Sequence, residues 1–237
     1  MATKATAKKP GARPAKKPAA KKPAPATVKR PPAAGKRAHN KQVIRNRIVK
    51  SALTLFQTKG FDTTTTKAIA RKAGIAEGTV FNYFKTKEDI ALSFFEAEVD
   101  HAIAAVRDNP RLRKASLEEK LFTLVHSQLE YLAPYERFIG AALMHALNPA
   151  SHLGPFSHRA QQMRLRYLAF VRELVEESSP KQQQAVLSWL VPEAFWIYYM
   201  GVLLFWLYDS SEDKQHTLAF LDRSLHVGVS LLTSGQR

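Results

Sequence analysis

The sequence contains no cysteine. Disulfides, thiolate nucleophiles and cysteine-ligated zinc sites are therefore excluded. Motifs of common enzyme classes are also missing, since there is no G-x-S-x-G, no H-E-x-x-H and no phosphate-binding glycine loop. The pair His126 and Glu130 on one helix face does not complete a metal site, and neither does the pair His152 and His158 beside a loop. We therefore predict that the protein is not an enzyme and has no catalytic residues, no cofactor and no metal.

Acidic residues are absent from the first part of the chain. Residues 1–41 carry 13 Lys or Arg and no Asp or Glu. Residues 42–87 carry 9 basic and 2 acidic residues, whereas residues 88–237 carry 14 basic and 18 acidic residues. The net charge of +16 thus arises entirely from the first 87 residues. This distribution predicts that an anionic partner binds at one end of the molecule.

Residues 1–41 also have few large apolar side chains and are rich in Lys, Ala and Pro. Such a segment buries too little apolar surface to offset its ordering entropy, so we predict a disordered basic tail. It lacks the apolar core of a secretory signal peptide, and Lys rather than Arg and Ser dominates, which disfavours a transit peptide. Two interpretations stay open: a solubilising extension or start-site artefact, and an accessory phosphate-binding arm.

The rest of the chain has no convincing alternating segment of the strand type and no internal repeat, whereas helical spacing recurs throughout. The sequence therefore predicts an all-α protein. The expected helices cover about 42–59, 66–73, 77–84, 87–109, 117–132, 136–147, 161–177, 180–208 with a kink at Pro192, and 212–232. We expect a DNA-binding domain over 42–88 and a C-terminal domain over 89–237.

One apolar run, residues 186–208, is long enough to cross a bilayer, which takes about 20 residues. It contains Ser188, Pro192 and Glu193, and amphipathic helices flank it on both sides. We therefore predict a buried core helix or an interface helix rather than a membrane span, and no membrane partner.

Residues 66–85, TKAIARKAGIAEGTVFNYFK, have the spacing of a helix-turn-helix. Ala70 allows a second helix to approach, Gly74 supplies the turn, and Val80 packs back against the first helix. In this motif the second helix enters the major groove of DNA. A small inner core should form around Ile69, Ala73, Ile75 and Val80.

The second helix of this motif should present its remaining side chains to solvent. Val80 and Phe84 face inward one helical turn apart, which leaves five residues exposed: Gly78, Thr79, Phe81, Asn82 and Tyr83. Tyr83 can donate to a phosphate, Thr79 can contact a phosphate or a thymine methyl, and Asn82 can pair with a base edge. An ordinary surface role is the alternative.

Residues 60–90, GFDTTTTKAIARKAGIAEGTVFNYFKTKEDI, resemble the signature of the TetR family of bacterial transcriptional regulators. The resemblance is specific over about residues 42–100. It implies a homodimer that places one recognition helix per subunit into successive major grooves of a palindromic operator. It also implies a C-terminal helical domain that binds an unknown small-molecule effector and releases DNA. The expected protein is a ligand-responsive repressor, cytoplasmic and associated with the nucleoid.

The resemblance also implies roles for single residues. Thr65 would cap the second helix and touch a phosphate, Thr79 and Asn82 would contact bases or backbone, and further phosphate contacts would come from Tyr83, Lys87 and Arg47. With Gly78 and Phe81, these residues form the predicted DNA-binding set. Ala76 departs from the serine usual in the family, which removes a cap bond typically worth about 1 kcal/mol. Glu77 partly compensates through the helix dipole but repels phosphate, and Phe81 stands where tyrosine is common.

The C-terminal domain should supply a dimer interface and an effector pocket. An apolar stripe with Leu221, Leu225 and Val229 would pair with residues 182–208 in a four-helix interface, as the resemblance suggests, with core packing as the alternative. Pockets are lined by apolar and aromatic side chains with a few polar groups. The residues of these types are Tyr131, Phe138, Met144, His145, Trp189, Trp196 and Tyr199, and core packing is the alternative for each.

Three other functions are alternatives to a ligand-responsive DNA-binding repressor. The first is a membrane-associated protein that uses residues 186–208, and the second is an enzyme of a type without a recognisable motif. The third is a nucleoid-type DNA binder dominated by the basic tail, which would show little sequence preference and a steep salt dependence.

Overall fold

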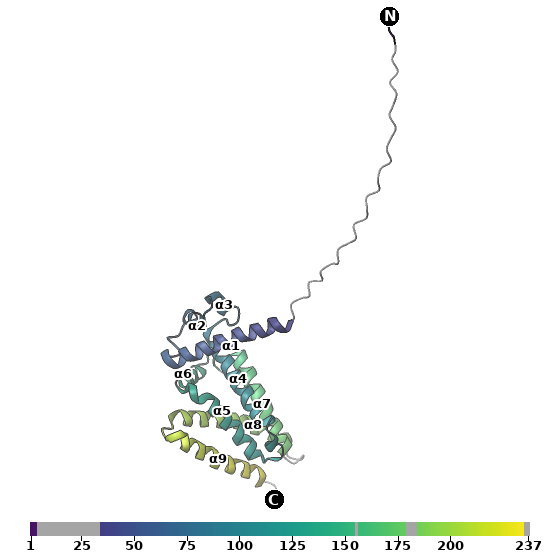
Figure 1. The fold of residues 1–237 in the computed structure, drawn as a ribbon. Coiled ribbons are helices and arrows are strands. Elements are labelled where there is room, and N and C mark those ends of the chain that lie inside the picture. Colours follow the sequence, from purple (N-terminus) through teal and green to yellow (C-terminus); the bar gives the residue numbers. More distant parts are fainter. Residues whose placement is uncertain (4–33, 155, 179–183, 235–237) are drawn as a thin grey trace.

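The computed structural model describes residues 1–3, 34–154, 156–178 and 184–234, and their regular structure is entirely helical (Figure 1). The predicted all-α class is therefore confirmed for this part of the chain. The α-helices are α1 Ala34–Lys59, α2 Thr66–Ala73, α3 Glu77–Phe81, α4 Lys87–Arg107, α5 Leu117–Leu132, α6 Glu136–Ala146, α7 His158–Ser178, α8 Gln184–Tyr208 and α9 Gln215–Ser234. Short 3-10 turns lie at Pro110–Lys114, Ala133–Tyr135 and Glu212–Lys214.

The first helix begins earlier than the sequence suggests. It starts at Ala34 rather than at Gln42, so residues 34–41 of the predicted disordered tail are helical. The rest of that prediction falls on residues 4–33, which lie outside the described residues, as does the predicted helix start at Ser179 and Pro180. The C-terminal end of α1 lies at Lys59, as expected. Gly60 follows it in a left-handed conformation with φ of 97°, which ends the helix.

The helices α1, α2 and α3 form a small unit at one end of the molecule, and α1 also packs on α4 and α6 (Figure 1). Its core consists of fully buried apolar side chains from every helix: Ile48, Phe56, Ile69 and Val80. The expected inner core of the helix-turn-helix is present, with Ala70 and Ala73 also buried and Ile75 packed against it.

The start of α4 is held by a capping box. The Thr86 hydroxyl accepts from the Asp89 amide at 3.1 Å, and the Asp89 carboxylate accepts from the Thr86 amide at 3.2 Å. Ser116 and Glu119 make the same arrangement at the start of α5. Both helices begin where the sequence predicts, at residues 87 and 117, because this motif is set by residues within one turn.

The C-terminal part consists of α4 to α9, in which α5 packs on α4 and α9, and α7 packs on α4 and α8. The helix α8 continues through Pro192 to Tyr208. Within the described residues one segment, Trp189–Tyr208, is long and apolar enough to span a membrane, and 39% of it is buried inside the chain. It is therefore a helix with one buried and one exposed apolar side, rather than a fully buried core helix.

The exposed sides of α8 and α9 carry a set of large apolar side chains, which we call the α8–α9 apolar face: Trp189, Leu190, Ile197, Leu204, Phe205, Tyr208, Phe220, Val227 and Leu231. The opposite sides of the same helices are buried, with Val202, Leu221 and Leu225 in the core. Contiguous exposed apolar surface of this kind marks an interaction surface.

Candidate DNA-binding surface and ligand cavity

The turn between α2 and α3 is built by local sequence. Thr65 caps α2, its hydroxyl accepting from the Ala68 amide at 3.2 Å, as predicted. Gly74 ends α2 with φ of 65°, a left-handed conformation that side chains rarely adopt. The Ile75 amide then donates to the Ala70 carbonyl at 3.1 Å. These bonds fix the direction in which α3 leaves α2.

The helix α3 has only five residues, Glu77–Phe81, and depends on its neighbours for stability. Val80 is fully buried and Phe84 is nearly so, as predicted. Ala76 stands at the N-cap and makes no side-chain cap bond. The Glu77 carboxylate accepts a hydrogen bond from the Thr66 hydroxyl at 2.9 Å, which ties α3 back to α2.

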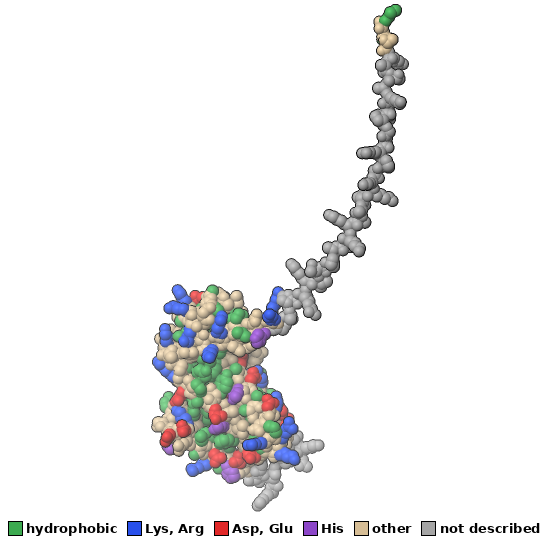
Figure 2. All heavy atoms as spheres, viewed as in Figure 1, with side chains coloured by type: hydrophobic (Ala, Val, Ile, Leu, Met, Phe, Trp, Pro, Cys, Tyr) green, Lys and Arg blue, Asp and Glu red, His purple; other side chains and the backbone are tan. Residues whose placement is uncertain are grey.

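The predicted DNA-binding residues of α3 and its end are all at least partly accessible to solvent. Phe81 is 50% exposed, Gly78 and Asn82 are exposed, and Thr79 and Tyr83 are half-buried. A side chain added at Gly78 would meet no atom within 4 Å, so the backbone there is open to a close approach. On the face seen in Figure 2, Lys and Arg dominate the lobe of α1 to α3, whereas Asp and Glu gather on the other lobe.

The predicted phosphate contacts outside α3 differ in their surroundings. Thr65 and Arg47 are exposed. The Lys87 ammonium instead donates to the carbonyls of Phe61 at 2.9 Å and Asp62 at 3.0 Å, and it lies 4.6 Å from the centre of the Phe61 ring. Lys87 therefore joins α4 to the end of α1, a role that the sequence reasoning missed because its partners lie 25 or more residues away.

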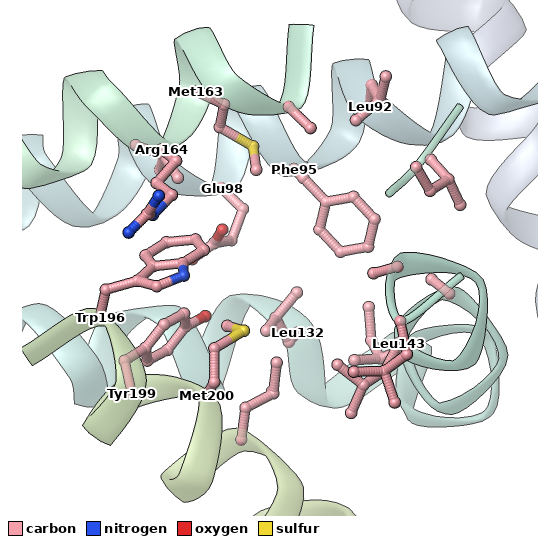
Figure 3. A pocket seen from close by; sticks show the side chains of 18 of the residues that line it. Leu92, Phe95, Glu98, Leu132, Leu143, Met163, Arg164, Trp196, Tyr199 and Met200 are labelled. Carbon is pink, nitrogen blue, oxygen red and sulfur yellow. The ribbon is translucent and has the colours of Figure 1, made fainter. Parts of the chain in front are cut away.

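A cavity of about 390 Å³ lies in the C-terminal part, between α4, α5, α6, α7 and α8 (Figure 3). Its walls are almost entirely apolar, and they include Leu92, Leu132, Leu143 and Leu203. Its size lies within the range typical of small-molecule sites, about 300–1,000 Å³.

Only two of the predicted pocket residues, Trp196 and Tyr199, line this cavity. Phe138 is fully buried in an aromatic cluster with Phe56, Phe61, Phe94 and Phe95. The Tyr131 ring packs on Phe94 at 5.3 Å, between ring centres. Met144 and Trp189 are more than 65% exposed, and His145 contacts Asp62. Residue type alone does not place a side chain at a cavity, because helix rotation decides the face.

One polar residue of the cavity was missed. Glu98 on α4 is 3% exposed, and burial raises the pKa of its carboxyl from 4.5 to about 8, an effect that the Gln128 side chain partly opposes. Its Oε1 atom has no hydrogen-bond partner among the described residues. The sequence held a signal, because Glu98 lies four residues from both Phe94 and Ala102, on the apolar stripe of α4.

The polar side chains lie at one end of the cavity. In Figure 3, Glu98, Arg164 and Trp196 lie together, and Leu143 lies at the opposite end. The Arg164 guanidinium lies 5.8 Å from the centre of the Trp196 ring and pairs with the Glu193 carboxylate. Arg164 Nε is buried without a partner within the described chain.

The helix α6 joins the cavity to the DNA-binding unit. Four of its residues line the cavity: Ile139, Ala142, Leu143 and Ala146. The Arg137 guanidinium donates to the Thr58 carbonyl of α1 at 3.3 Å, and the Phe138 amide donates to the Gln57 side chain at 3.2 Å. His145 Nε2 lies 2.7 Å from the Asp62 carboxylate. A displacement of α6 by a ligand would therefore move the end of α1.

The helix α7 makes a second connection. Ala160, Met163 and Arg164 line the cavity. The neighbouring Arg159 pairs with Glu96 at 2.7 Å and with Asp89 at 3.1 Å. Asp89 is the capping residue at the start of α4, next to the end of the helix-turn-helix. The helix α7 thus links the cavity to the start of α4, which follows the DNA-binding unit, whereas α6 contacts that unit directly.

The described residues contain no group of three or more His, Asp or Glu side chains that could hold a metal ion.

Comparisons with known proteins cover both parts of the chain. Residues 48–94 match the family model of bacterial regulatory proteins of the tetR family, and residues 120–236 match that of the tetracyclin repressor-like C-terminal domain. A fatty acid metabolism regulator protein of Bacillus subtilis (strain 168) is 31% identical over 86 residues, which are 36% of this chain and 44% of the relative. The chain thus spans less than half the length of the curated relatives it matches.

Solved structures support the same fold. A TetR transcriptional regulator from Nitrosomonas europaea ATCC 19718 aligns with a TM-score of 0.61 and 20% identity, over 78% of this chain and 96% of that one. The regulator FadR from Bacillus subtilis, solved with stearoyl-CoA, aligns with a TM-score of 0.58 and 21% identity, over 76% and 94%. These relatives are transcriptional regulators and not enzymes, in agreement with the sequence-based prediction. The chain therefore belongs to the TetR family of bacterial regulatory proteins.

Proposed function

We propose that the protein is a sequence-specific, DNA-binding transcriptional repressor that releases DNA when an apolar ligand fills the C-terminal cavity. One observation carries this proposal: α6 lines the cavity with Leu143 and its neighbours while Arg137 and His145 hold the end of α1. A ligand can shift an equilibrium only through contacts that differ between two states, and in this proposal the contacts of α6 with α1 and of α7 with α4 are the ones that change.

The DNA contacts come from α3 and its flanks in this proposal. Asn82 reads a base edge, Thr79 contacts a base or the backbone, and Tyr83 binds a phosphate. Gly78 and Phe81 meet the backbone at close range, and further phosphate contacts come from Thr65 and Arg47. Lys87 contributes chiefly by holding the end of α1 in place, since two of its three donors are already engaged.

A homodimer completes the DNA-binding form. Two copies would bury the α8–α9 apolar face against each other in a four-helix interface. This arrangement covers side chains such as Ile197, which is 72% exposed, and Val227, which is 57% exposed. It also explains why α8 is apolar enough to cross a membrane although the remaining helices are amphipathic. The expected location is the cytoplasm, on DNA.

The proposed ligand has an acyl chain. Burial of one CH₂ group contributes about 0.8 kcal/mol, so an almost wholly apolar cavity favours a long alkyl chain. The Bacillus subtilis structure was solved with stearoyl-CoA, and that protein has the same fold. Long-chain acyl-CoA esters are therefore the first ligands to test.

Alanine variants of the α3 surface test the DNA-binding part. Asn82→Ala should weaken binding to a selected operator by about 1–3 kcal/mol, with little change in binding to random duplex. Tyr83→Ala, which loses a phosphate contact, should weaken binding to the operator and to random duplex alike. Leu165→Ala on α7, exposed and remote from α3, is the control. Unchanged operator affinity in both variants, with folding intact, would contradict the assignment.

Deletion of residues 1–33 tests the alternative hypothesis of a nucleoid-type DNA binder that binds mainly through its basic tail. If the basic tail dominates, the truncated chain loses most of its affinity and most of its salt dependence. The present proposal predicts a uniform, modest loss for all sequences and a retained preference for the operator.

A further inference from the structure

The polar end of the cavity contains buried groups without partners, and their assignment to a ligand rests on the proposed acyl effector. Three buried side-chain atoms have no partner at hydrogen-bond distance in the described part of the chain: Glu98 Oε1, Arg164 Nε and Gln128 Nε2. The Gln128 side chain nevertheless lies near enough to the Glu98 carboxyl to lower its pKa in part. Two of these three atoms belong to residues that line the cavity, Glu98 and Arg164. Buried polar groups in native proteins are nearly always bonded, so unpartnered groups at a cavity point to a ligand that bonds to them.

The carboxyl group of Glu98 is buried at the cavity wall and has no cationic partner among the described residues. It is 97% removed from solvent, and no Lys or Arg pairs with it among the ion pairs of the described residues. Arg164, the one Lys or Arg among the described residues that line the cavity, is already paired with Glu193. A buried, unpaired carboxyl costs stability, which an apolar side chain at the same place would avoid.

We propose that Glu98 is a specificity-determining residue, whose carboxyl group donates a hydrogen bond to the carbonyl oxygen of an acyl ligand. The alkyl chain then extends past Met200 towards Leu143, through the apolar part of the cavity (Figure 3). The head group leaves beside Arg164, whose side chain is 42% exposed.

The charge state of Glu98 fits this role. The titratable groups around it are Tyr131 on α5, Tyr167 on α7 and Tyr199 on α8, all with raised pKa values and therefore neutral at pH 7, and Arg164. With a pKa of about 8, the Glu98 carboxyl keeps its proton at neutral pH and can donate it in a hydrogen bond. Above that pH it becomes an acceptor only and repels the carbonyl oxygen.

The test compares two ligands that differ at one carbon, which is a carbonyl in one ligand and a methylene in the other. Dodecanoyl-CoA and its thioether analogue S-dodecyl-CoA have the same chain and the same head group, but the thioether has no carbonyl. Calorimetric titration of the full chain with each ligand at pH 6.5 and pH 9 gives the affinity ratio. We expect wild type to prefer the acyl ester by about tenfold at pH 6.5 and to lose most of this preference at pH 9.

Two variants of Glu98 distinguish a hydrogen bond donated by its side chain from the packing of that side chain against the ligand. Glu98→Gln keeps a donor without titrating, so its preference for the ester should persist at both pH values. Glu98→Leu has no donor and should bind the two ligands equally. Glu173→Gln, which removes an exposed carboxylate on α7, is the matched control and should behave as wild type. If Glu98→Leu does not fold, the pH dependence of wild type still decides the question.

Several outcomes would overturn the inference. Equal affinity of wild type for the two ligands at pH 6.5 would refute the Glu98 contact while leaving the acyl effector in place. No binding of either ligand would refute the acyl effector and the Glu98 contact together. Tighter binding of dodecyltrimethylammonium, with affinity that rises with pH, would show that Glu98 acts as a counter-ion for a cation.

Discussion

Glu98→Gln should change how the stability of the protein depends on pH. Glutamine has nearly the same shape as glutamic acid, so the packing around α4 and the cavity is retained. The substitution removes one titrating group whose pKa is about 8 in the folded chain and 4.5 in its ordinary state. A carboxyl with a raised pKa holds its proton in the folded chain after the unfolded chain has lost it.

The sign and size of the effect follow from this difference. Between pH 4.5 and pH 8 the unfolded chain binds fewer protons, so wild-type stability falls as the pH rises and levels off above pH 8. The slope is up to about 1.4 kcal/mol per pH unit. Relative to Glu98→Gln, wild type should lose about 2–3 kcal/mol between pH 5 and pH 7, and about 4 kcal/mol between pH 5 and pH 9.

Urea denaturation of both proteins at pH 5, 7 and 9 measures the effect. The difference between the two free energies of unfolding cancels the contributions of the other titrating groups, which both proteins share. Glu173→Gln serves as the control, because Glu173 lies on the surface, paired with Arg107. A constant difference between wild type and Glu98→Gln over this pH range would refute the raised pKa.

Three further substitutions test other parts of the structure. Ile197→Glu places a charge on the α8–α9 apolar face and should convert dimer to monomer in analytical ultracentrifugation. Leu165→Glu on α7 is the control and should stay dimeric. A dimeric Ile197→Glu would contradict the interface. Arg137→Ala removes the donor to the Thr58 carbonyl. It should leave DNA affinity nearly unchanged and weaken ligand-induced release of DNA, both of which fluorescence anisotropy can measure. Full release would argue against coupling through α6. Phe138→Ala empties the centre of an aromatic cluster and should cost about 3–5 kcal/mol in denaturant unfolding, and a loss below 1 kcal/mol would refute its buried position.

The helix-turn-helix could be predicted from the sequence because its determinants are local. Thr65, Gly74 and the Thr86–Asp89 capping box each act within one turn of the residues they stabilise. Val80 and Phe84 follow from helical periodicity alone. The same reasoning placed the start of α1 too late, since residues 34–41 lack the apolar stripe from which a helix is recognised.

The cavity could not be predicted in the same way. Its lining comes from five helices, and whether an aromatic residue faces the cavity or the core depends on how those helices pack. Phe138 and His145 therefore lie at the junction with α1 and its following turn and do not line the cavity. Glu98 resembled its exposed neighbours in the sequence FFEAEVD, although its spacing from Phe94 placed it on the buried side.

Selection of bound duplexes from a random DNA pool, with and without dodecanoyl-CoA, tests the central claim most directly. We expect the full chain to enrich a palindrome with half-sites about one helical turn apart, as two recognition helices in a dimer require. Addition of the ester should release the selected duplex. Enrichment of no sequence, or an enriched duplex that stays bound at saturating ester and at saturating concentrations of other apolar ligands, would contradict a ligand-responsive, operator-specific repressor.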